Sequence, residues 1–194
     1  MADHLNPVRR ALRKSAISAP PDPWREVARL AVGGLTGVGF ERENETLLVT
    51  SANGQSVIDC TNGERLYRNR DDDGLGHGFL QAQRLDRPQD APISTSGIEG
   101  GGLPCLTTDG WTCRSIPLDW PETFHILEPP GASIYFSKSL FAGSNKDATF
   151  FLMAKAADET RAFGFSWTGQ TLIWACSSDL FIWSRAPENR ATRS

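Results

Sequence analysis

One pattern occurs twice in this chain, and it constrains the fold more than any other feature. In each copy a Gly-Phe pair is followed by five residues, then by a threonine and two apolar residues. Another apolar residue comes seventeen positions after the phenylalanine. The first copy is Gly39-Phe40, Thr46-Leu47-Leu48 and Val57, and the second is Gly164-Phe165, Thr171-Leu172-Ile173 and Ile182. Short apolar runs joined by tight turns are typical of antiparallel strands, so the chain carries one paired-strand unit twice.

Turn signals divide the rest of the chain into short strands. Asn53-Gly54 and Asn62-Gly63 are strong hairpin signals, because both residue types tolerate the positive φ of a tight turn. Residues 148–156 suit a strand buried on both faces, although their spacing is also compatible with a helix. The other predicted strands are 35–41, 46–51, 56–60, 65–68, 103–107, 111–116, 123–127 and 133–136, with a final hairpin in 161–184. The predicted fold is mainly β, with antiparallel meanders in a partial propeller-like or sandwich arrangement and a short N-terminal helical arm.

The N-terminal 34 residues are predicted to form that helical arm. Asn6 as cap and Pro7 in the first helical position predict one helix, which ends before Pro20. Asp22 followed by Pro23 predicts a second helix, anchored on the β body by Trp24. The predicted domains are therefore an arm over 1–34, a single β domain over 35–186 and a flexible tail over 187–194.

The charge is unevenly distributed along the 194 residues, whose net charge is -3. Residues 1–18 have a balance of +3 and the remainder of -6. The basic arm is compatible with docking on its own body, on a partner or on an anionic surface, or with a solvated terminus. So small a net charge does not favour nucleic-acid binding, and no apolar run is long enough for a signal peptide or a membrane helix. We expect a cytoplasmic protein without nucleic-acid or membrane partners.

The reactive residues are few. Cys60, Cys105, Cys113 and Cys176 form no Cys-x-x-Cys pair and are expected as buried free thiols, with a Cys105–Cys113 bridge left open. The Asp71–His77 loop is either a solvated acidic loop or a divalent-cation site. His125 is either a packed strand residue or a base, and a Cys113–His125–Asp119 triad is a further alternative. No cofactor or metal is predicted.

Tryptophans are the more suggestive group. Those on or beside predicted strands are either core residues or members of an exposed patch for a protein partner or a carbohydrate. The candidate protein-binding residues are Trp111, Trp120, Trp167 and Trp174, together with Arg9, Arg10 and Arg13 of the arm.

The second copy resembles a WD40-type propeller blade. The resemblance lies in Gly164-Phe165-Ser166-Trp167-Thr168-Gly169-Gln170-Thr171-Leu172, Ser177-Ser178-Asp179 and Ile182-Trp183, and more weakly in residues 38–60. It implies a turn that closes at Gly169 and a Trp183 packed between neighbouring sheets. At about 40–45 residues per blade the chain has room for about three or four. A closed propeller usually needs more, so the resemblance implies a partial propeller, a sandwich or a ring completed by a partner.

A second resemblance covers residues 33–68 together with Gly100-Gly101-Gly102-Leu103-Pro104 and Asp109-Gly110-Trp111. These segments are similar to a group of uncharacterised bacterial proteins, and the similarity implies no activity.

The leading hypothesis is a non-catalytic cytoplasmic protein-interaction β domain of bacterial type, of which an immunity or antitoxin-like protein is a specific version. One alternative is a small hydrolase or metal-dependent enzyme that uses the Asp71–His77 loop or His125. Another is a structural subunit of a larger assembly. The expected partner is another protein, and a homo-oligomer is also open.

Overall fold

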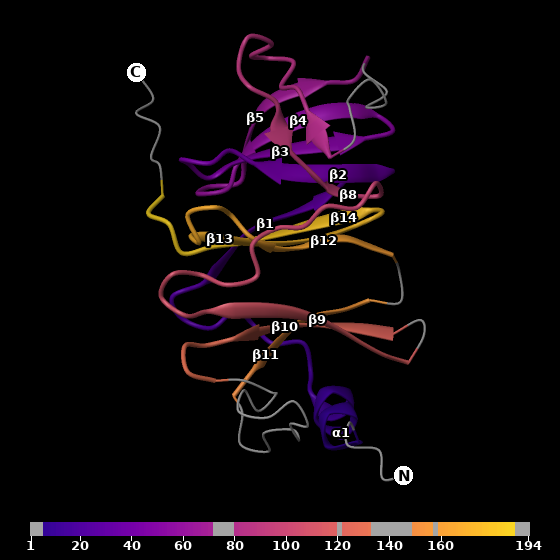
Figure 1. Ribbon diagram of the computed structural model, residues 1–194, viewed down its shortest axis with the longest axis vertical. Coiled ribbons are helices and arrows are strands. Elements are labelled where there is room, and N and C mark those ends of the chain that lie inside the picture. The colour runs from indigo at the N-terminus through magenta and orange to yellow at the C-terminus, as the bar shows by residue number, and fades with distance from the viewer. Residues whose placement is uncertain (1–5, 72–79, 120–121, 133–148, 157–158, 189–194) are drawn as a thin grey trace. The chain divides into compact units, whose positions relative to one another are not determined.

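Antiparallel strands make up most of the structure, a computed structural model that describes residues 6–71, 80–119, 122–132, 149–156 and 159–188 (Figure 1). The chain divides into two compact units that alternate along the sequence. The first unit comprises residues 1–21 and 105–157, and the second comprises 22–104 and 158–194. The predicted mainly β fold with antiparallel meanders and a short N-terminal helix is confirmed.

The second unit contains two larger sheets. One has the order β1-β14-β13-β12, and in Figure 1 the indigo strand β1 joins the yellow and orange strands of the C-terminal hairpin. The other has the order β5-β4-β3-β2-β8, and β6 pairs with β7 alone. The strands are β1 (Arg25–Ala31), β2 (Leu35–Phe40), β3 (Thr46–Ser51), β4 (Gly54–Asp59), β5 (Glu64–Asn69), β6 (Gln81–Ala82), β7 (Ile93–Ser94), β8 (Ser96–Gly97), β12 (Thr160–Phe165), β13 (Thr171–Cys176) and β14 (Asp179–Ser184).

The two copies of the sequence pattern form the same cross-strand rung in these sheets. In the first copy Gly39 lies opposite Leu48, which lies opposite Val57. In the second copy Gly164 lies opposite Ile173, which lies opposite Ile182. Eighteen positions separate the glycine from the third residue of its rung in both copies, and the phenylalanine follows the glycine directly. This is why the apolar residue comes seventeen positions after the phenylalanine.

The two sheets share one hydrophobic core, but the two copies turn opposite faces toward it. The first copy contributes the face that carries Phe40, while its Leu48 and Val57 pack with Ala82 and Ile93 in a separate cluster. The second copy contributes the face of Ile173 and Ile182. Side chains of a strand alternate between its two faces, so these two faces are not equivalent in the two copies. One copy is therefore stacked front to back on the other. The shared core comprises Leu35, Val38, Phe40, Leu47, Val49, Ile58, Cys60, Ala162, Ile173, Ala175, Leu180 and Ile182.

The glycine of each rung makes room for another segment of the chain. A Cβ on Gly39 would lie 2.4 Å from the Ser94 carbonyl oxygen, and one on Gly164 would lie 2.4 Å from the Leu103 Cβ. Any larger residue at either position would therefore force β7 or the 103–104 segment away from its sheet. Phe165 N–H donates to the Pro104 carbonyl at 2.8 Å.

The second predicted helix is wrong, because residues 25–31 form the edge strand β1. Leu30 pairs with Leu180, and the Arg29 guanidinium lies 4.6 Å from the centre of the Phe181 ring. The stripe of Val27, Leu30 and Ala31 is compatible with a helix, but the open edge of β14 offers a ladder of main-chain hydrogen bonds that outweighs local propensity. Trp24 does anchor the segment, since it is buried with its ring 5.6 Å from that of Phe165.

The first unit is a three-stranded sheet with the order β11-β10-β9 and one helix. Its elements are α1 (Asn6–Lys14), β9 (Thr112–Asp119), β10 (Glu122–Glu128) and β11 (Phe151–Ala156). The predicted first helix is confirmed, and it docks on its own body. Leu12 is fully buried with Phe124, Ile126 and Leu152, and Ser18 N–H donates to the Leu152 carbonyl at 2.8 Å.

Three other predictions have different outcomes. The strand expected at 103–107 is wrong, because only an isolated bridge from Leu106 to Thr112 forms there. Pro104 has no N–H to donate to a ladder, which explains the irregular path. The strand expected at 133–136 lies outside the described residues, as does most of the predicted tail over 187–194.

Candidate functional site

The turns of the two copies meet within the second unit. The first turn comprises residues 41–45 and the second comprises 166–170, each directly after the Gly-Phe pair. The Thr168 hydroxyl donates to the Glu45 carboxylate, and the Arg42 guanidinium lies 4.7 Å from the centre of the Trp167 ring. Arg42 and Trp167 occupy equivalent positions, each two residues after its phenylalanine.

Both turns are held by their own side chains. Asn44 Oδ1 accepts from Thr46 N–H at 2.9 Å, while Asn44 Nδ2 donates to Glu41 Oε2 at 2.6 Å. In the second turn Ser166 Oγ accepts from Thr171 N–H at 3.1 Å. Gly169 has φ +72°, as the predicted turn requires. Local side-chain hydrogen bonds of this kind fix a turn without help from a regular ladder.

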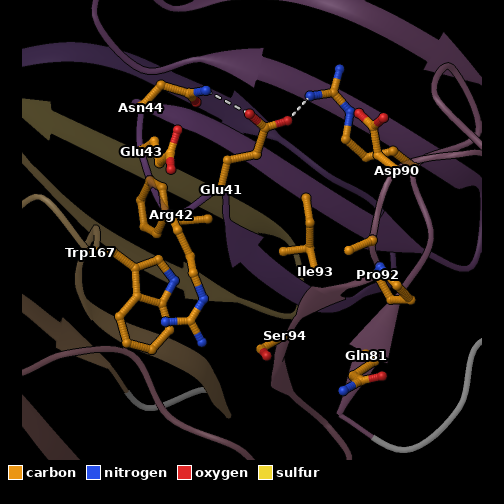
Figure 2. A pocket seen from close by; sticks show the side chains of 13 residues that line it. Glu41, Arg42, Glu43, Asn44, Gln81, Asp90, Pro92, Ile93, Ser94 and Trp167 are labelled. Carbon is orange, nitrogen blue, oxygen red and sulfur yellow. Dashed lines mark hydrogen bonds and ion pairs between the residues drawn. The ribbon is translucent and has the colours of Figure 1, made fainter.

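A pocket of about 590 Å³ lies beside this junction (Figure 2). Ile93 lies at its centre, with Trp167 and Arg42 on one side and Pro92 and Gln81 on the other. Its lining comprises Phe40, Glu41, Arg42, Glu43, Asn44, Gln81, Arg84, Asp90, Ala91, Pro92, Ile93, Ser94 and Trp167.

A buried ion-pair network forms one wall of this pocket. Arg84 is only 3% exposed and pairs with both Glu41 and Asp86, with 3.0 Å between Arg84 Nε and Asp86 Oδ1. The hydrogen bond to Asp86 raises the pKa of Arg84, and the same bond lowers the pKa of Asp86. The fully buried Gln55 accepts from Leu85 N–H at 2.9 Å and so fixes the segment that carries Arg84.

Carboxylates outnumber guanidinium groups at the pocket. Glu41, Glu43 and Asp90 line it together with Arg42 and Arg84, and Asp86 lies behind Arg84. Glu45 adds a buried carboxylate beneath the junction, and its Oε2 has no hydrogen-bond partner among the described residues. The lining itself thus holds three carboxylates and two arginines, and Arg84 is already paired twice. The potential of the pocket is negative.

Of the four tryptophans predicted to bind a partner, Trp167 lines the pocket. Its side chain is 42% exposed. Trp111 is buried in the first unit, and Trp174 is half-buried with its Nε1 3.3 Å from Thr160 Oγ1. Trp120 lies outside the described residues. Within the second unit, Trp174 is not among the residues that line the pocket.

The predicted arginines lie elsewhere. Arg9, Arg10 and Arg13 belong to α1 in the first unit, where Arg13 Nε is 4.0 Å from Glu122 Oε2. None of them lines the pocket.

The residues of the Cys113–His125–Asp119 alternative lie in the first unit. His125 is fully buried, and burial lowers its pKa to about 4, so the ring is neutral at pH 7. Its Nδ1 lies 2.9 Å from Ser115 Oγ. Burial raises the pKa of the Cys113 thiol, the opposite of what a nucleophile needs. Cys113 lies opposite Leu127 rather than His125, and the side chain of Asp119 is outside the described part of the chain.

The remaining candidates have mixed outcomes. All four cysteines are free, and Cys105 is exposed rather than buried as expected. Cys113 N–H donates to the Cys105 carbonyl at 3.0 Å. Residues 72–79, which include most of the acidic loop and His77, lie outside the described ranges. The part of the chain that is described contains no group of three or more potential metal ligands and no helix able to span a membrane.

No protein-family model matches this sequence, and the search of curated proteins found no match. The role of the pocket residues is therefore argued from their geometry. Sequence reasoning missed Glu41, Arg84, Asp90 and Ile93, because they come from three segments that no motif connects. One signal was available: equivalent turns in two stacked copies come out at the same end of their sheets, which places Arg42 near Trp167.

Proposed function

We propose that this protein is a non-catalytic protein-interaction β domain that receives a side chain of its partner in the junction pocket. The observation that carries this proposal is Trp167, a large aromatic residue that is 42% exposed at the wall of a preformed cavity. Tryptophan is enriched among the residues that dominate binding energy at protein interfaces. The Arg42 guanidinium lies 4.7 Å from the centre of this ring and holds the Trp167 side chain at the wall of the cavity.

The pocket's own chemistry favours binding over catalysis. Glu41 is held by Arg84 and Asn44, so it is committed to structure. The lining residues include no histidine, cysteine or lysine. Of the groups proposed for an enzyme, His125 and Cys113 are buried in the other unit, and their shifted pKa values hold both in uncharged forms at pH 7. Most of the Asp71–His77 loop lies outside the described residues.

The WD40-type resemblance remains part of this proposal. Blades of a propeller are antiparallel meanders repeated around an axis, so each stacks front to back on the next. The front-to-back stacking of the two copies supports the resemblance. A cytoplasmic, bacterial, immunity or antitoxin-like role is the specific version that we propose.

Affinity capture with matched variants tests the proposal. The bait proteins are the wild type, Trp167→Ala and Leu106→Ala, the last removing an apolar side chain that is 61% exposed in the first unit. We expect a protein that is retained by the wild type and by Leu106→Ala but lost by Trp167→Ala. The purified protein should then bind the wild type with a defined stoichiometry in calorimetry. An identical set of proteins on all three baits would contradict the proposal.

A further inference from the structure

We propose that the junction pocket is a binding site for an arginine side chain presented by the partner. This inference rests on the proposed function, since it names the chemistry of the side chain that enters the pocket. It is carried by three features of the pocket: its charge, its aromatic wall and its apolar floor.

The charge of the pocket selects a cation. Figure 2 shows Glu43 on the side of the Trp167 wall and Asp90 on the opposite side, beyond Glu41. Both carboxylates are exposed, and no described residue pairs with either one. A guanidinium that entered between them would form charge-assisted hydrogen bonds, which are stronger than neutral ones.

The aromatic wall already holds a guanidinium. Arg42 lies 4.7 Å from the centre of the Trp167 ring, and stacking on Trp167 is the only interaction of its side chain within the described residues. Planar guanidinium groups stack on tryptophan faces better than ammonium groups do. Arg42 therefore shows how the guanidinium of an incoming arginine would stack on Trp167. Arg42 also competes with that guanidinium for the ring and for the negative potential of the pocket.

The floor suits the rest of an arginine side chain. Phe40 and Ile93 are buried apolar residues, and the exposed Pro92 extends this surface toward the rim. Arginine lays its methylene groups along apolar surface while its charged head stays near polar groups. The volume of about 590 Å³ accommodates the side chain together with part of the adjoining backbone.

The paired Arg84 in the wall makes the pocket selective for cations over anions. Arg84 is paired with Glu41 and Asp86, so it offers little attraction to an anion. The same pairing keeps the Glu41 carboxylate in place, and a preformed site binds with less reorganisation.

The test is an NMR titration of the full chain at low ionic strength. The probe is a capped pentapeptide with arginine at its centre and glycine elsewhere, and its control carries citrulline, the neutral isostere of arginine. The observed signal is the indole N–H of Trp167, assigned with Trp167→Phe. We expect saturable shifts with the arginine peptide and at least about tenfold weaker binding of the citrulline peptide.

Three variants sharpen the result. Asp90→Asn should weaken binding of the arginine peptide about three- to tenfold, because it removes a facing carboxylate. Asp71→Asn is the matched control, an exposed acid outside the pocket whose loss should leave the affinity unchanged. Arg42→Ala should tighten binding about threefold, because it frees the Trp167 ring and removes a competing charge.

Four results would overturn the inference: no saturable shift with the arginine peptide, equal binding of the citrulline peptide, no effect of Asp90→Asn, or shifts produced by methyl glycosides but not by the peptide. Its failure is distinguishable from failure of the proposed function. If Trp167→Ala fails to capture a protein that the wild type captures, and the arginine peptide does not bind, then the proposed interaction site is retained and its proposed specificity for arginine is wrong.

Discussion

The two copies of the Gly-Phe unit have the same cross-strand pairing, but the residues that surround them differ. Phe40 packs into the core between the two sheets, whereas Phe165 packs on the other face of its sheet against Trp24. The turn after Phe40 is Glu-Arg-Glu-Asn-Glu, and the turn after Phe165 is Ser-Trp-Thr-Gly-Gln. The shared positions set the fold, and the turns, which no ladder constrains, set the pocket. One copy supplies charge to this pocket and the other supplies the aromatic ring.

The largest expected effect comes from removing either phenylalanine. Phe40 is 2% exposed and Phe165 is 0% exposed. Phe40→Ala and Phe165→Ala should each lower the free energy of unfolding by about 3–5 kcal/mol, measured by urea denaturation. A loss below about 1 kcal/mol for either variant would show that its copy does not pack as described.

A pH titration separates the first unit from the two copies, which contain no histidine. The pKa of His125 is about 4 in the folded protein and 6.5 as a reference, so the unfolded state binds the proton more tightly. The stability that a neutral His125 provides is complete above pH 6.5 and is lost as the pH falls toward 4. The loss should amount to about 3 kcal/mol.

His125→Gln should flatten that part of the stability profile between pH 6.5 and 4, as followed by urea denaturation at each pH. An unchanged slope in His125→Gln would show that His125 is not the titrating group.

The rung glycines should be equally intolerant in both copies. Gly39→Ala and Gly164→Ala should each cost about 1–3 kcal/mol, since the new Cβ would lie 2.4 Å from its neighbour. Gly102→Ala is the matched control, because no atom lies within 4 Å of its added Cβ. Chemical denaturation of the three variants measures the contrast, and equal stability of all three would contradict the close crossings.

The smallest expected effect is the coupling between the two turns. A double-mutant cycle with Arg42→Ala and Trp167→Ala should give an interaction energy of about 0.5–1 kcal/mol for the stacked pair. The same cycle with Arg42→Ala and Trp174→Ala should give none, because Trp174 is not in contact with Arg42 through any described interaction. Equal interaction energies in the two cycles would show that Arg42 and Trp167 are not in specific contact, and would contradict the meeting of the two turns.

The sequence predicted much of the fold where local signals and tertiary pairing agree. The Asn-Gly turns and the strands 46–51 and 65–68 follow from alternation and turn chemistry. Residues 25–31 were assigned the wrong element, since only the open edge of β14 makes them a strand. Of the candidate site, Trp167 was predicted. Arg84 was not, because its burial depends on Glu41, more than forty residues away in sequence.

The contact between Arg42 and Trp167 places the two turns of the junction side by side, and NMR tests this geometry most directly. The side-chain protons of Arg42 should be shifted upfield by the ring current of Trp167 and should show NOEs to its ring protons. Both signatures should disappear in Trp167→Leu. Random-coil chemical shifts for the Arg42 side chain in the wild-type protein would contradict the account.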